Sequence, residues 1–490
     1  MLGLAKGDRP RMVTKTITFS PFSRLEGDLE VKIEVADGQI VRALASGTLY
    51  RGFETMLRGR DPLDAIVITC RVCGQCGLAH SAASAAALRA VAGTPMPRNA
   101  CVAINVMLGI ETILSHLTHF YLSFAPDLAE PPNGDDAAER FRAPSGRAFA
   151  RTLREREEIL GVLGLFAGKW PNTLAIQPGG TTRPLDASEI RRAQGLLGEF
   201  TEFIGEQVIG CELDRWLALS SAPDLDRWLG EGSHAASDMG AFITVALKRG
   251  LDKLGVWPAR FISSGGWDDP TGATLMRSGF HNGAPAPFNP SAIAEHVKYS
   301  WYDEYEGGVH PFDGESEPAA ERTEAYSWAK APRYAGQPAE AGPLARLVND
   351  RDPLVTSLLD KHGPSVFVRE MARLHETLRL LKQIGVWLGE VDPEAPFCQG
   401  VPRMESGSGM GLVEAPRGVL GHWLRVEEGR IRNYQIITPT GWNLSPRDSQ
   451  DQPGPLESAL VGTPVPDPER PVAVSHVVKS FDPCLFCTVH

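Results

Sequence analysis

The chain has 490 residues and a formal net charge of −11, with 42% hydrophobic and 22% charged residues. This composition is ordinary for a globular protein, and the acidic balance argues against nucleic acid as a partner, because nucleic acid selects basic surfaces. No run approaches the roughly 18 to 20 apolar residues of a membrane-spanning helix, and the N-terminus lacks the apolar stretch of a signal peptide. We therefore expect a cytoplasmic protein that associates with membranes only through partners.

The N-terminal region is predicted to form strands. Leu29, Val31, Ile33 and Val35 alternate with polar residues, and Asp37-Gly38 supplies a turn before a second alternating run. This pattern predicts a β-hairpin region over residues 15–45.

The middle of the chain is predicted to be helical. An alanine-rich segment runs from residue 78 to about 93, and the next segment places apolar residues on one face from Val106 to Phe124. Helical patterns also cover about 152–167, 186–209 and 366–390, so residues 78–390 are expected to form a mainly helical core. Within it, the stretch 260–345 is rich in Gly, Pro, Asp and Trp, and we expect long ordered loops with short elements there.

The C-terminal region returns to a β pattern. Residues 409–437 contain a second turn, "VEEGRI", so 409–490 is expected to combine a β segment with a tail. We find no internal repeat. The predicted fold class is α+β and mainly α, a central helical bundle with peripheral short β-sheets, folded as a single intertwined unit over 1–490.

Five of the eight cysteines lie in two clusters at opposite ends of the chain: Cys70, Cys73 and Cys76, then Cys484 and Cys487. A terminus frays unless something holds it, and thiolate and imidazole are ligands that soft and borderline metals prefer. Three interpretations stay open. A ferredoxin-type cluster would lack its fourth cysteine and the following proline. The alternatives are a tetrahedral zinc site and a catalytic soft-metal centre, each with four thiolates.

The residues around the cysteines favour the catalytic centre. "RVCGQCGLAH" and "FDPCLFCTVH" resemble the two signature motifs of the large subunit of [NiFe] hydrogenases. Further segments resemble that family in the right order along the chain: "SRLEGDLEV", "LYRGFETMLRGRDP", "SHLTHFY", "APRGVLGHW" and "TPTGWN". The wording is closest to the cytosolic uptake and hydrogen-sensing branch, and the resemblance implies the large-subunit fold.

The resemblance implies a nickel–iron centre held by four cysteines. Cys73 and Cys484 would be terminal nickel thiolates, whereas Cys76 and Cys487 would also bridge to an iron that carries CO and two cyanides. Four soft thiolates suit nickel. The activity implied is the reversible heterolytic cleavage of H2 to protons and electrons.

Other residues acquire roles from the same resemblance. Cys484 with Glu26 would take the proton, since the guanidinium of Arg417 is too weak a base and would instead polarise hydrogen and bind cyanide. His80 is expected to hydrogen-bond a bridging sulfur. The remaining cofactor-binding residues would be Pro416, Thr440, whose hydroxyl would bind cyanide, and Asp482, which would pair with Arg417.

The terminal histidine also has a counterpart in the family. His490, Glu54 and a backbone carbonyl near Ile436 would bind Mg²⁺ or a similar ion, which would clamp the tail. The resemblance further implies a maturation protease that trims a precursor after His490, and nickel insertion factors.

The resemblance also implies a partner. Cys101, Cys211 and Cys398 are scattered and are expected to be small buried residues, so the chain cannot hold an iron–sulfur wire of its own. Iron–sulfur clusters are expected only in a small subunit, in a heterodimer or a dimer of heterodimers. Two other functions stay open: an H2-sensing subunit with low turnover, and a structural zinc–thiolate protein.

Five positions depart from the family pattern. Cys70 stands in place of glutamine, Ser115 in place of aspartate, and Asn172 in place of histidine. Gln75 and Ser123 replace apolar residues that line a gas channel. These polar replacements are expected to alter gas access.

Overall fold

The computed structural model describes residues 14–129, 136–269 and 274–490. Its α-helices are α1 (Phe53–Leu57), α2 (Asp64–Thr69), α3 (Gly77–Ala92), α4 (Arg98–Leu117), α5 (Asp136–Glu139), α6 (Arg147–Ala167), α7 (Ala187–Phe203), α8 (Leu213–Leu217), α9 (Ala222–Leu229), α10 (Asp238–Lys248), α11 (Pro343–Asp350), α12 (Pro353–His362), α13 (Val366–Glu390), α14 (Pro439–Asn443), α15 (Pro455–Leu460), α16 (Val472–Ser480) and α17 (Leu485–Thr488). Short π or 3₁₀ segments are η1 (Thr118–Phe124), η2 (Ala125–Ala129), η3 (Ile204–Ile209), η4 (His234–Ala236) and η5 (Pro290–Ala292).

The strands form small antiparallel sheets. Three of the sheets have three strands each: β1 (Lys15–Phe19), β2 (Leu29–Ala36) and β3 (Gln39–Gly47); β6 (Phe261–Asp268), β7 (Thr274–His281) and β8 (Pro285–Ala286); β11 (Gly407–Ala415), β12 (Gly418–Glu427) and β13 (Arg430–Ile437). Two-stranded pairs are β4 (Ile176–Gln177) with β5 (Gly180–Thr181), and β9 (Ile293–His296) with β10 (Ala331–Tyr334).

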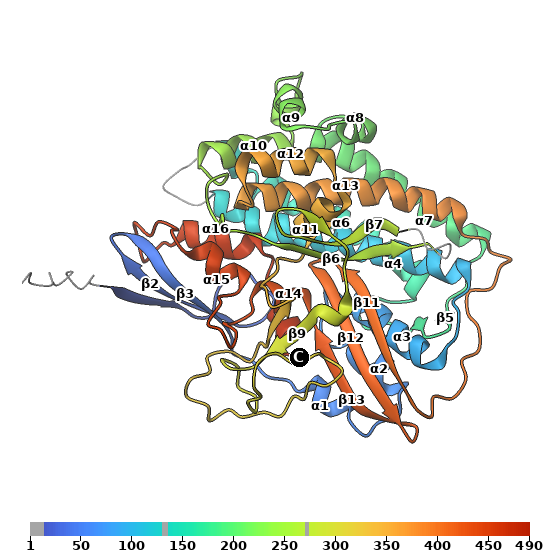
Figure 1. The fold of residues 1–490 in the computed structure, drawn as a ribbon. Helices are drawn as coiled ribbons and strands as arrows, with labels where there is room; N and C mark the ends of the chain where they lie inside the picture. The colour runs from blue at the N-terminus through green and yellow to red at the C-terminus, as the bar shows by residue number, and fades with distance from the viewer. Residues whose placement is uncertain (1–13, 130–135, 270–273) are drawn as a thin grey trace, which may run out of the picture.

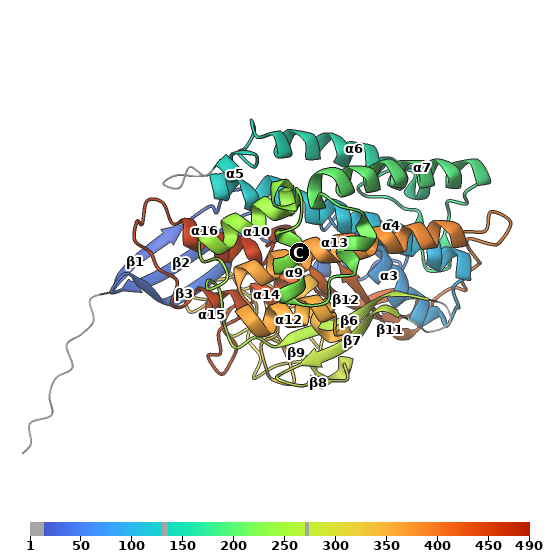
Figure 2. The same cartoon turned by 90° about the horizontal axis from the view of Figure 1, so that it is seen from above.

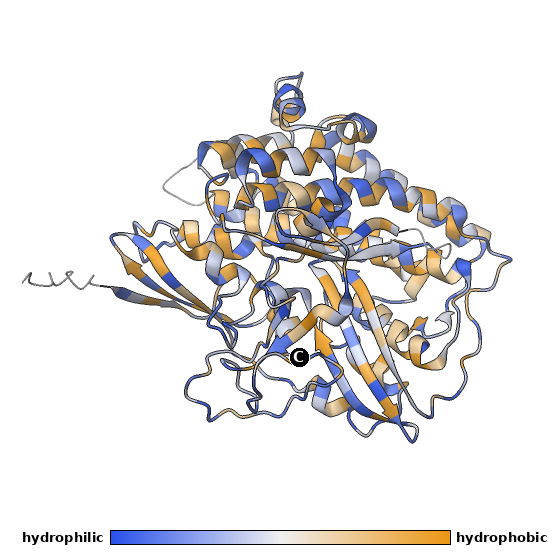
Figure 3. Ribbon diagram, in the orientation of Figure 1, coloured by the Kyte–Doolittle hydropathy of each residue, from blue (hydrophilic) through white to orange (hydrophobic). Residues whose placement is uncertain are grey.

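The long helices form one layer, and most of the sheets lie below it together with the shorter helices α1, α2 and α14 and helix α3 (Figure 1). In Figure 1, α4, α6, α7, α10 and α13 lie above the β11–β12–β13 sheet, while β1–β3 project at one end. Figure 2 shows the same sheet β1–β3 at the edge of the molecule and α6 beside α7. The outer helices α7 and α12 mix hydrophobic and hydrophilic residues along their length (Figure 3), as expected for helices with one face on a core. These features confirm the α+β, mainly helical class.

Several predicted elements occur with changed boundaries. Helix α13 runs over Val366–Glu390, as predicted. The N-terminal hairpin is confirmed, but β1 adds a third strand to it. Within the predicted core, the stretch 260–345 was expected to hold long loops with short elements, and β8, η5, β9 and β10 are such elements. Strands β6 and β7 have eight residues each and are longer than expected, because neither shows the alternation of buried and exposed residues by which a strand is predicted.

The segment Arg98–Ala129 is long and apolar enough to cross a membrane by length and composition, which the count of uninterrupted apolar residues missed. Its apolar window is completely buried inside the protein. Helix α4 packs against α6 and α13. The segment therefore has the environment of a core helix, and its hydropathy alone is weak evidence for a membrane span.

Helix α3 lies unusually close to the strands β11 and β12. A Cβ atom at Gly409 or Gly411 of β11 would overlap the carbonyl oxygens of Ala87 or Ala83 on α3. Alanines on the helix and glycines on the strand are therefore both needed for this approach. The contact brings His80 of α3 next to His422 of β12 and fixes the helix that follows the first cysteine motif.

The C-terminus lies inside the protein. Both views place it in the middle of the molecule (Figures 1 and 2). Val489 is fully buried, and only 9% of the surface of His490 is exposed. One hydrophobic cluster includes residues from Phe22 to Cys487, so both ends of the chain contribute to the same core.

Candidate metal centre

Each cysteine pair lies at the start of a helix. Cys76 is the residue before α3, and Cys484 is the residue before α17. In the first motif the backbone N–H of Gln75 donates to the Cys73 sulfur at 3.2 Å. In the second motif the N–H of Cys487 donates to the Cys484 carbonyl at 3.1 Å. Exposed N–H groups at a helix start favour negative charge, and therefore favour thiolates.

The two pairs meet, as the sequence predicted. The Cys73 and Cys484 sulfurs lie 3.5 Å apart, the Cys76 and Cys487 sulfurs 3.3 Å, and the Cys484 and Cys487 sulfurs 3.2 Å. All four are free thiols with at most 4% exposure. Thiolates that share a metal at about 2.3 Å lie under about 4 Å from one another, so this spacing fits a metal-ligand set. Cys70 is buried but is not part of the cluster.

The four thiols cannot all ionise without a compensating cation. Hydrogen bonds from Cys484, Cys487 and Cys76 hold the pKa of Cys73 well below its usual range. Burial and the neighbouring thiols raise the pKa of Cys487. For Cys76 and Cys484 a hydrogen bond from Cys487 lowers the pKa, but donation to Cys73 and burial outweigh it. A bound metal would supply the positive charge and release protons.

Arg417 covers the cysteines from the strand connection between β11 and β12. Its Nε donates to the Asp482 carbonyl at 3.0 Å and lies 3.1 Å from Asp482 Oδ1. Burial opposes its charge, but Asp482 and the cysteines raise its pKa well above the usual value. Its Nη1 is buried without a hydrogen-bond partner among the described residues. An unpaired buried donor beside four thiols fits a further acceptor, such as a cofactor ligand.

The other cofactor-binding residues predicted from the resemblance lie near this arginine. The Thr440 hydroxyl oxygen accepts from the Cys484 N–H at 3.2 Å, which leaves its own proton free to donate. Asp482 Oδ1 also contacts His119 Nδ1 at 3.1 Å. Burial opposes ionisation of Asp482, but Arg417 and His119 hold its pKa below the usual range. The Pro416 carbonyl accepts from Arg346 at 3.0 Å.

Glu26 lies beside the second cysteine motif. Its carbonyl accepts from the Leu485 N–H at 2.6 Å, and its carboxyl oxygen Oε1 accepts from Gln75 Nε2 at 3.1 Å. Burial raises its pKa, against a smaller effect of Arg417. Gln75, one of the unusual residues, therefore lies between Glu26 and the first cysteine motif, and its side-chain oxygen is buried without a partner in the described parts of the chain.

His80 does not make the sulfur contact that the resemblance implied. Its Nδ1 faces His422 Nε2 at 3.1 Å, and its Nε2 has no hydrogen-bond partner in the portion of the chain covered by the structure. The close packing of α3 on β11 and β12 places the imidazole toward the strand. The unpaired Nε2 is therefore the ring atom of His80 that is available to interact with a group bound by the four cysteines.

The C-terminal histidine meets Glu54 of α1. His490 Nδ1 donates to the Cys487 carbonyl at 2.6 Å, so the lone pair of the neutral ring is on Nε2, which faces Glu54 Oε1 at 3.3 Å. Two facing acceptors fit a bridging cation. Ile436 offers its N–H rather than its carbonyl to Glu54, at 2.7 Å.

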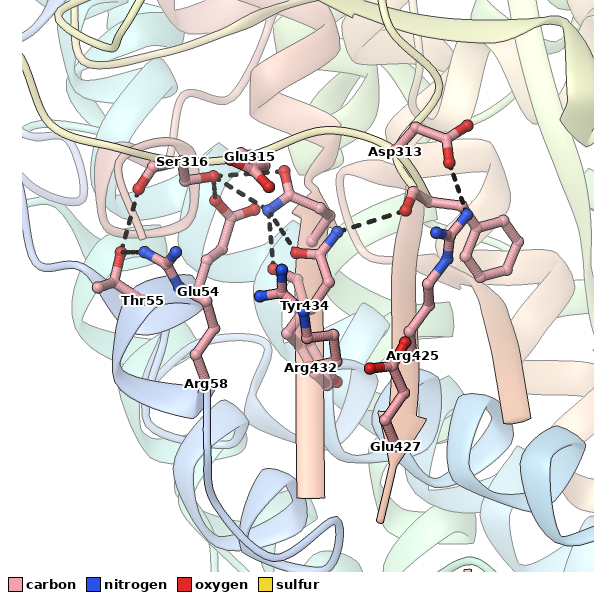
Figure 4. Close-up of a pocket in the computed structure, with 13 residues that line it drawn as sticks. Glu54, Thr55, Arg58, Asp313, Glu315, Ser316, Arg425, Glu427, Arg432 and Tyr434 are labelled. Atoms are coloured by element: carbon pink, nitrogen blue, oxygen red, sulfur yellow. Dashed lines mark hydrogen bonds and ion pairs between the residues drawn. The ribbon is translucent and has the colours of Figure 1, made fainter. Parts of the chain in front are cut away.

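A lysine completes this cluster. Lys330 Nζ lies 3.0 Å from Glu54 Oε2, 2.7 Å from Gln435 Oε1 and 3.6 Å from Glu295. Burial opposes the charge on Glu54, but the Lys330 ammonium and the hydrogen bond from Ser316 hold its pKa low. The ammonium satisfies one carboxylate oxygen, and the other faces His490. Figure 4 shows Glu54 at the wall of a polar cavity of about 290 Å³.

The other departures from the family pattern have local explanations in part. Ser123 donates to the Arg24 carbonyl at 2.6 Å, which ties η1 to the loop that carries Glu26. Asn172 has φ +60°, a left-handed conformation that asparagine tolerates. Ser115 is buried, with no side-chain hydrogen bond to the described residues. Cys398 is exposed, so the expectation that it is buried was wrong.

Sequence reasoning missed Arg51. Its Nη2 donates to the carbonyl of Val72 at 2.5 Å and to the carbonyl of Phe486, so one guanidinium holds both cysteine segments. The ring of Phe53 lies 4.8 Å and that of Phe486 5.3 Å from its central carbon. The sequence did contain a signal for it, since Arg51 lies in the same motif, "RGFE", from which Glu54 was predicted as a metal ligand. Lys330 had no such signal.

Comparisons with known proteins agree with this site. The family described as nickel-dependent hydrogenase matches residues 51–138 and 147–490. The chain is 31% identical to the periplasmic [NiFeSe] hydrogenase large subunit of Desulfomicrobium baculatum, over 97% of this chain and 94% of that one. It is 28% identical to the hydrogenase-2 large chain of Escherichia coli, over 98% and 97%. The reduced Ni-Fe-Se hydrogenase of D. vulgaris Hildenborough has a TM-score of 0.85 and 30% identity, covering 98% of this chain and 100% of that chain.

Proposed function

The chain belongs to the nickel-dependent hydrogenase family as a large subunit, and on that premise we propose that it catalyses the reversible heterolytic cleavage of H2 to protons and electrons. One observation supports this proposal most strongly: four buried free thiols from the two ends of the chain lie within 3.2 to 3.5 Å of a neighbouring thiol. A zinc–thiolate interpretation has no support from the relatives.

Cys73, Cys76, Cys484 and Cys487 would hold the nickel–iron centre. When bound, that centre, with CO and two cyanides on its iron, would supply the redox chemistry of H2. Arg417 has a buried donor, Nη1, available for a cyanide, and the Thr440 hydroxyl, which accepts from the Cys484 N–H, would donate its proton to the centre. The Asp482 carboxylate holds the guanidinium in place at 3.1 Å. These residues bind and orient, because none of them is a base strong enough to take a proton from H2.

Glu26 is the proposed proton acceptor beyond Cys484. Its backbone pairs with that of Cys484, and burial raises its pKa toward the range in which a carboxyl exchanges protons at neutral pH.

Glu26→Gln keeps the hydrogen bond acceptor for Gln75 but cannot take up a proton. We expect at least a hundredfold slower H/D exchange with unchanged nickel content, as for the loss of a general base. Glu34→Gln on β2, a partly exposed carboxylate that pairs with Arg42, is the control. An unchanged exchange rate in Glu26→Gln would exclude this carboxyl from the proton path.

The cation and partner assignments follow from the same premise. Glu54 and His490 would bind Mg²⁺ or a similar ion, which clamps the tail beside Cys487. We further propose a small subunit that carries the iron–sulfur clusters, in a heterodimer or a dimer of heterodimers, and a maturation protease and nickel insertion factors that act before assembly. We place the complex in the cytoplasm, associated with membranes only through partners.

The experiment is H2-dependent dye reduction by the complex purified with its small subunit, combined with infrared spectroscopy. The proposal predicts steady turnover and one CO band with two cyanide bands. Bands with very low turnover would favour the sensing alternative. Absence of all three bands from a preparation that contains bound nickel would refute the proposed centre.

A further inference from the structure

Three buried polar side chains form a hydrogen-bonded chain from α3, the helix that follows Cys76, to a cavity wall. His80 of α3, His422 of β12 and Tyr434 of β13 each have 0% exposure. His80 Nδ1 lies 3.1 Å from His422 Nε2, and His422 Nδ1 lies 2.7 Å from the Tyr434 hydroxyl. The three residues form one continuous hydrogen-bonded chain, and the free end is His80 Nε2.

The chain has a preferred direction. A phenol hydroxyl is a stronger donor than the N–H of a neutral imidazole, and an imidazole nitrogen is the stronger acceptor. Tyr434 therefore donates to His422 Nδ1, so His422 carries its proton on Nε2 and donates it to His80 Nδ1. His80 in turn carries its proton on Nε2. The reverse direction would leave a lone pair at His80 Nε2, in the electrostatic field of Cys73.

We propose that Tyr434 is a positioning residue that fixes the tautomer of His80, so that the Nε2–H of His80 serves as a hydrogen-bond donor to the cysteine-held centre. The inference rests on the proposed function, because the acceptor for this donor is part of that centre. Tyr434 does not touch the cysteines. It acts through His422, which the sequence motif "GHW" contains but which the resemblance had given no role.

The same three groups are poorly suited to carry protons. Burial lowers the pKa of His80 to about 3 and that of His422 well below its usual range. Burial also raises the pKa of Tyr434. Passing a proton along the chain would need a charged imidazole or phenolate, and burial disfavours both. A fixed, neutral hydrogen-bond chain is the arrangement that this environment supports.

The position of Tyr434 makes the idea testable. Tyr434 lines the polar cavity of about 290 Å³ in Figure 4, at the opposite end of the chain from the thiols. A change there removes one hydroxyl and leaves every proposed metal ligand intact. Tyr334→Phe is a matched control, because Tyr334 is also buried and, among the described residues, its hydroxyl bonds only to the 287–289 segment.

The experiment is infrared spectroscopy of the assembled complex with Tyr434→Phe. Loss of the hydroxyl frees His422 to reverse the chain, so His80 no longer donates to the centre. The acceptor in the centre then loses this hydrogen bond, and the iron becomes richer in electrons. We expect the CO band to shift to lower wavenumber at unchanged nickel content, while Tyr334→Phe leaves it in place. Bands that coincide with wild type in Tyr434→Phe would overturn the proposal, as would slower H/D exchange without a band shift, which indicates a proton relay.

A second measurement does not depend on the behaviour of Tyr434→Phe. The ¹⁵N spectrum of the wild-type complex labelled in histidine should show His80 and His422 as Nε2–H tautomers, with His422→Gln used for assignment. A proton on Nδ1 of either ring would overturn the proposal. Because this spectrum is of the wild-type complex, the test still holds if Tyr434→Phe fails to retain nickel. Failure of the proposed function is distinct, because the wild-type bands would then be absent.

Discussion

Arg51 is a single side chain that joins the two ends of the chain. It donates to the carbonyls of Val72 and Phe486, each of which is next to a metal-ligating cysteine. Burial lowers its pKa and three of the cysteines raise it, so its charge faces the sulfur cluster. The guanidinium therefore provides both geometry and positive charge where the thiolates gather.

Arg51→Gln should weaken the connection between the two motifs. A hydrogen bond to a charged group contributes about 1.5 to 3 kcal/mol, so with Arg51 partly exposed we expect a loss of about 2 kcal/mol and lower nickel content. Thermal unfolding and metal analysis measure both. Arg58→Gln is the control, because its ion pair with Glu317 is partly exposed and should contribute under about 1 kcal/mol. Full nickel content in Arg51→Gln would contradict this role.

Residue roles could be predicted only where a motif surrounded them. Cys73, Cys76, Cys484 and Cys487 meet as predicted, because their spacing carries information. The partner of His80 could not be predicted, since His422 comes to it by the packing of a helix on a strand about 340 residues away. Lys330 likewise reaches Glu54 from a loop with no periodic pattern.

At the scale of elements, one carboxylate joins three helices. Glu376 of α13 accepts from His116 of α4 at 2.8 Å and from Arg346 of α11 at 2.7 and 2.5 Å. Arg346 also reaches Glu414 of β11 at 3.0 Å. This network fixes the helical layer over the sheet that carries Arg417 at its turn.

Acid should weaken this network in a defined pH window. Burial opposes the charge on Glu376, but Arg346 and His116 lower its pKa from 4.5 to about 2. Because the folded pKa is depressed, the stabilisation is present above pH 4.5 and is lost as pH falls toward 2. The difference corresponds to about 3 kcal/mol. The free energies of unfolding of wild type and Glu376→Gln, measured with denaturant, should therefore approach each other by about that amount between pH 5 and 2. Glu390→Gln is the control, because its partly exposed ion pair with Arg98 should contribute little, and a pH-independent gap would contradict the assignment.

The first cysteine helix is also supported from another element. Glu111 of α4 accepts the N–H groups of Leu78 and Ala79 at 2.9 and 3.0 Å, and Trp170 Nε1 at 3.1 Å. It thus caps the start of α3 directly after Cys76. Helices such as α13 were predictable from their period. This cap and the glycine-dependent approach of β11 were not, because they depend on contacts between distant segments.

At the scale of the whole molecule, the fold brings the ends of the chain into one core. The sequence predicted that meeting from matching ligand pairs, and it predicted the mainly helical class. It could not predict where the small sheets lie, since β6 and β7 lack an alternating pattern and their positions depend on packing against α11 and, for β6, β11. The burial of His490 follows from the meeting of the ends, because the tail lies where Glu54 of α1 and the β13 strand converge.

The most direct test of the central claim is nickel X-ray absorption of the purified complex. If the four cysteines hold one bimetallic centre, the wild-type spectrum shows a shell of sulfur neighbours and an iron neighbour, and Cys484→Ser loses both together with the bound nickel. Cys398→Ser, which changes an exposed cysteine outside the cluster, should leave the spectrum unchanged. Nickel without an iron neighbour, or full nickel retention in Cys484→Ser, would contradict the account.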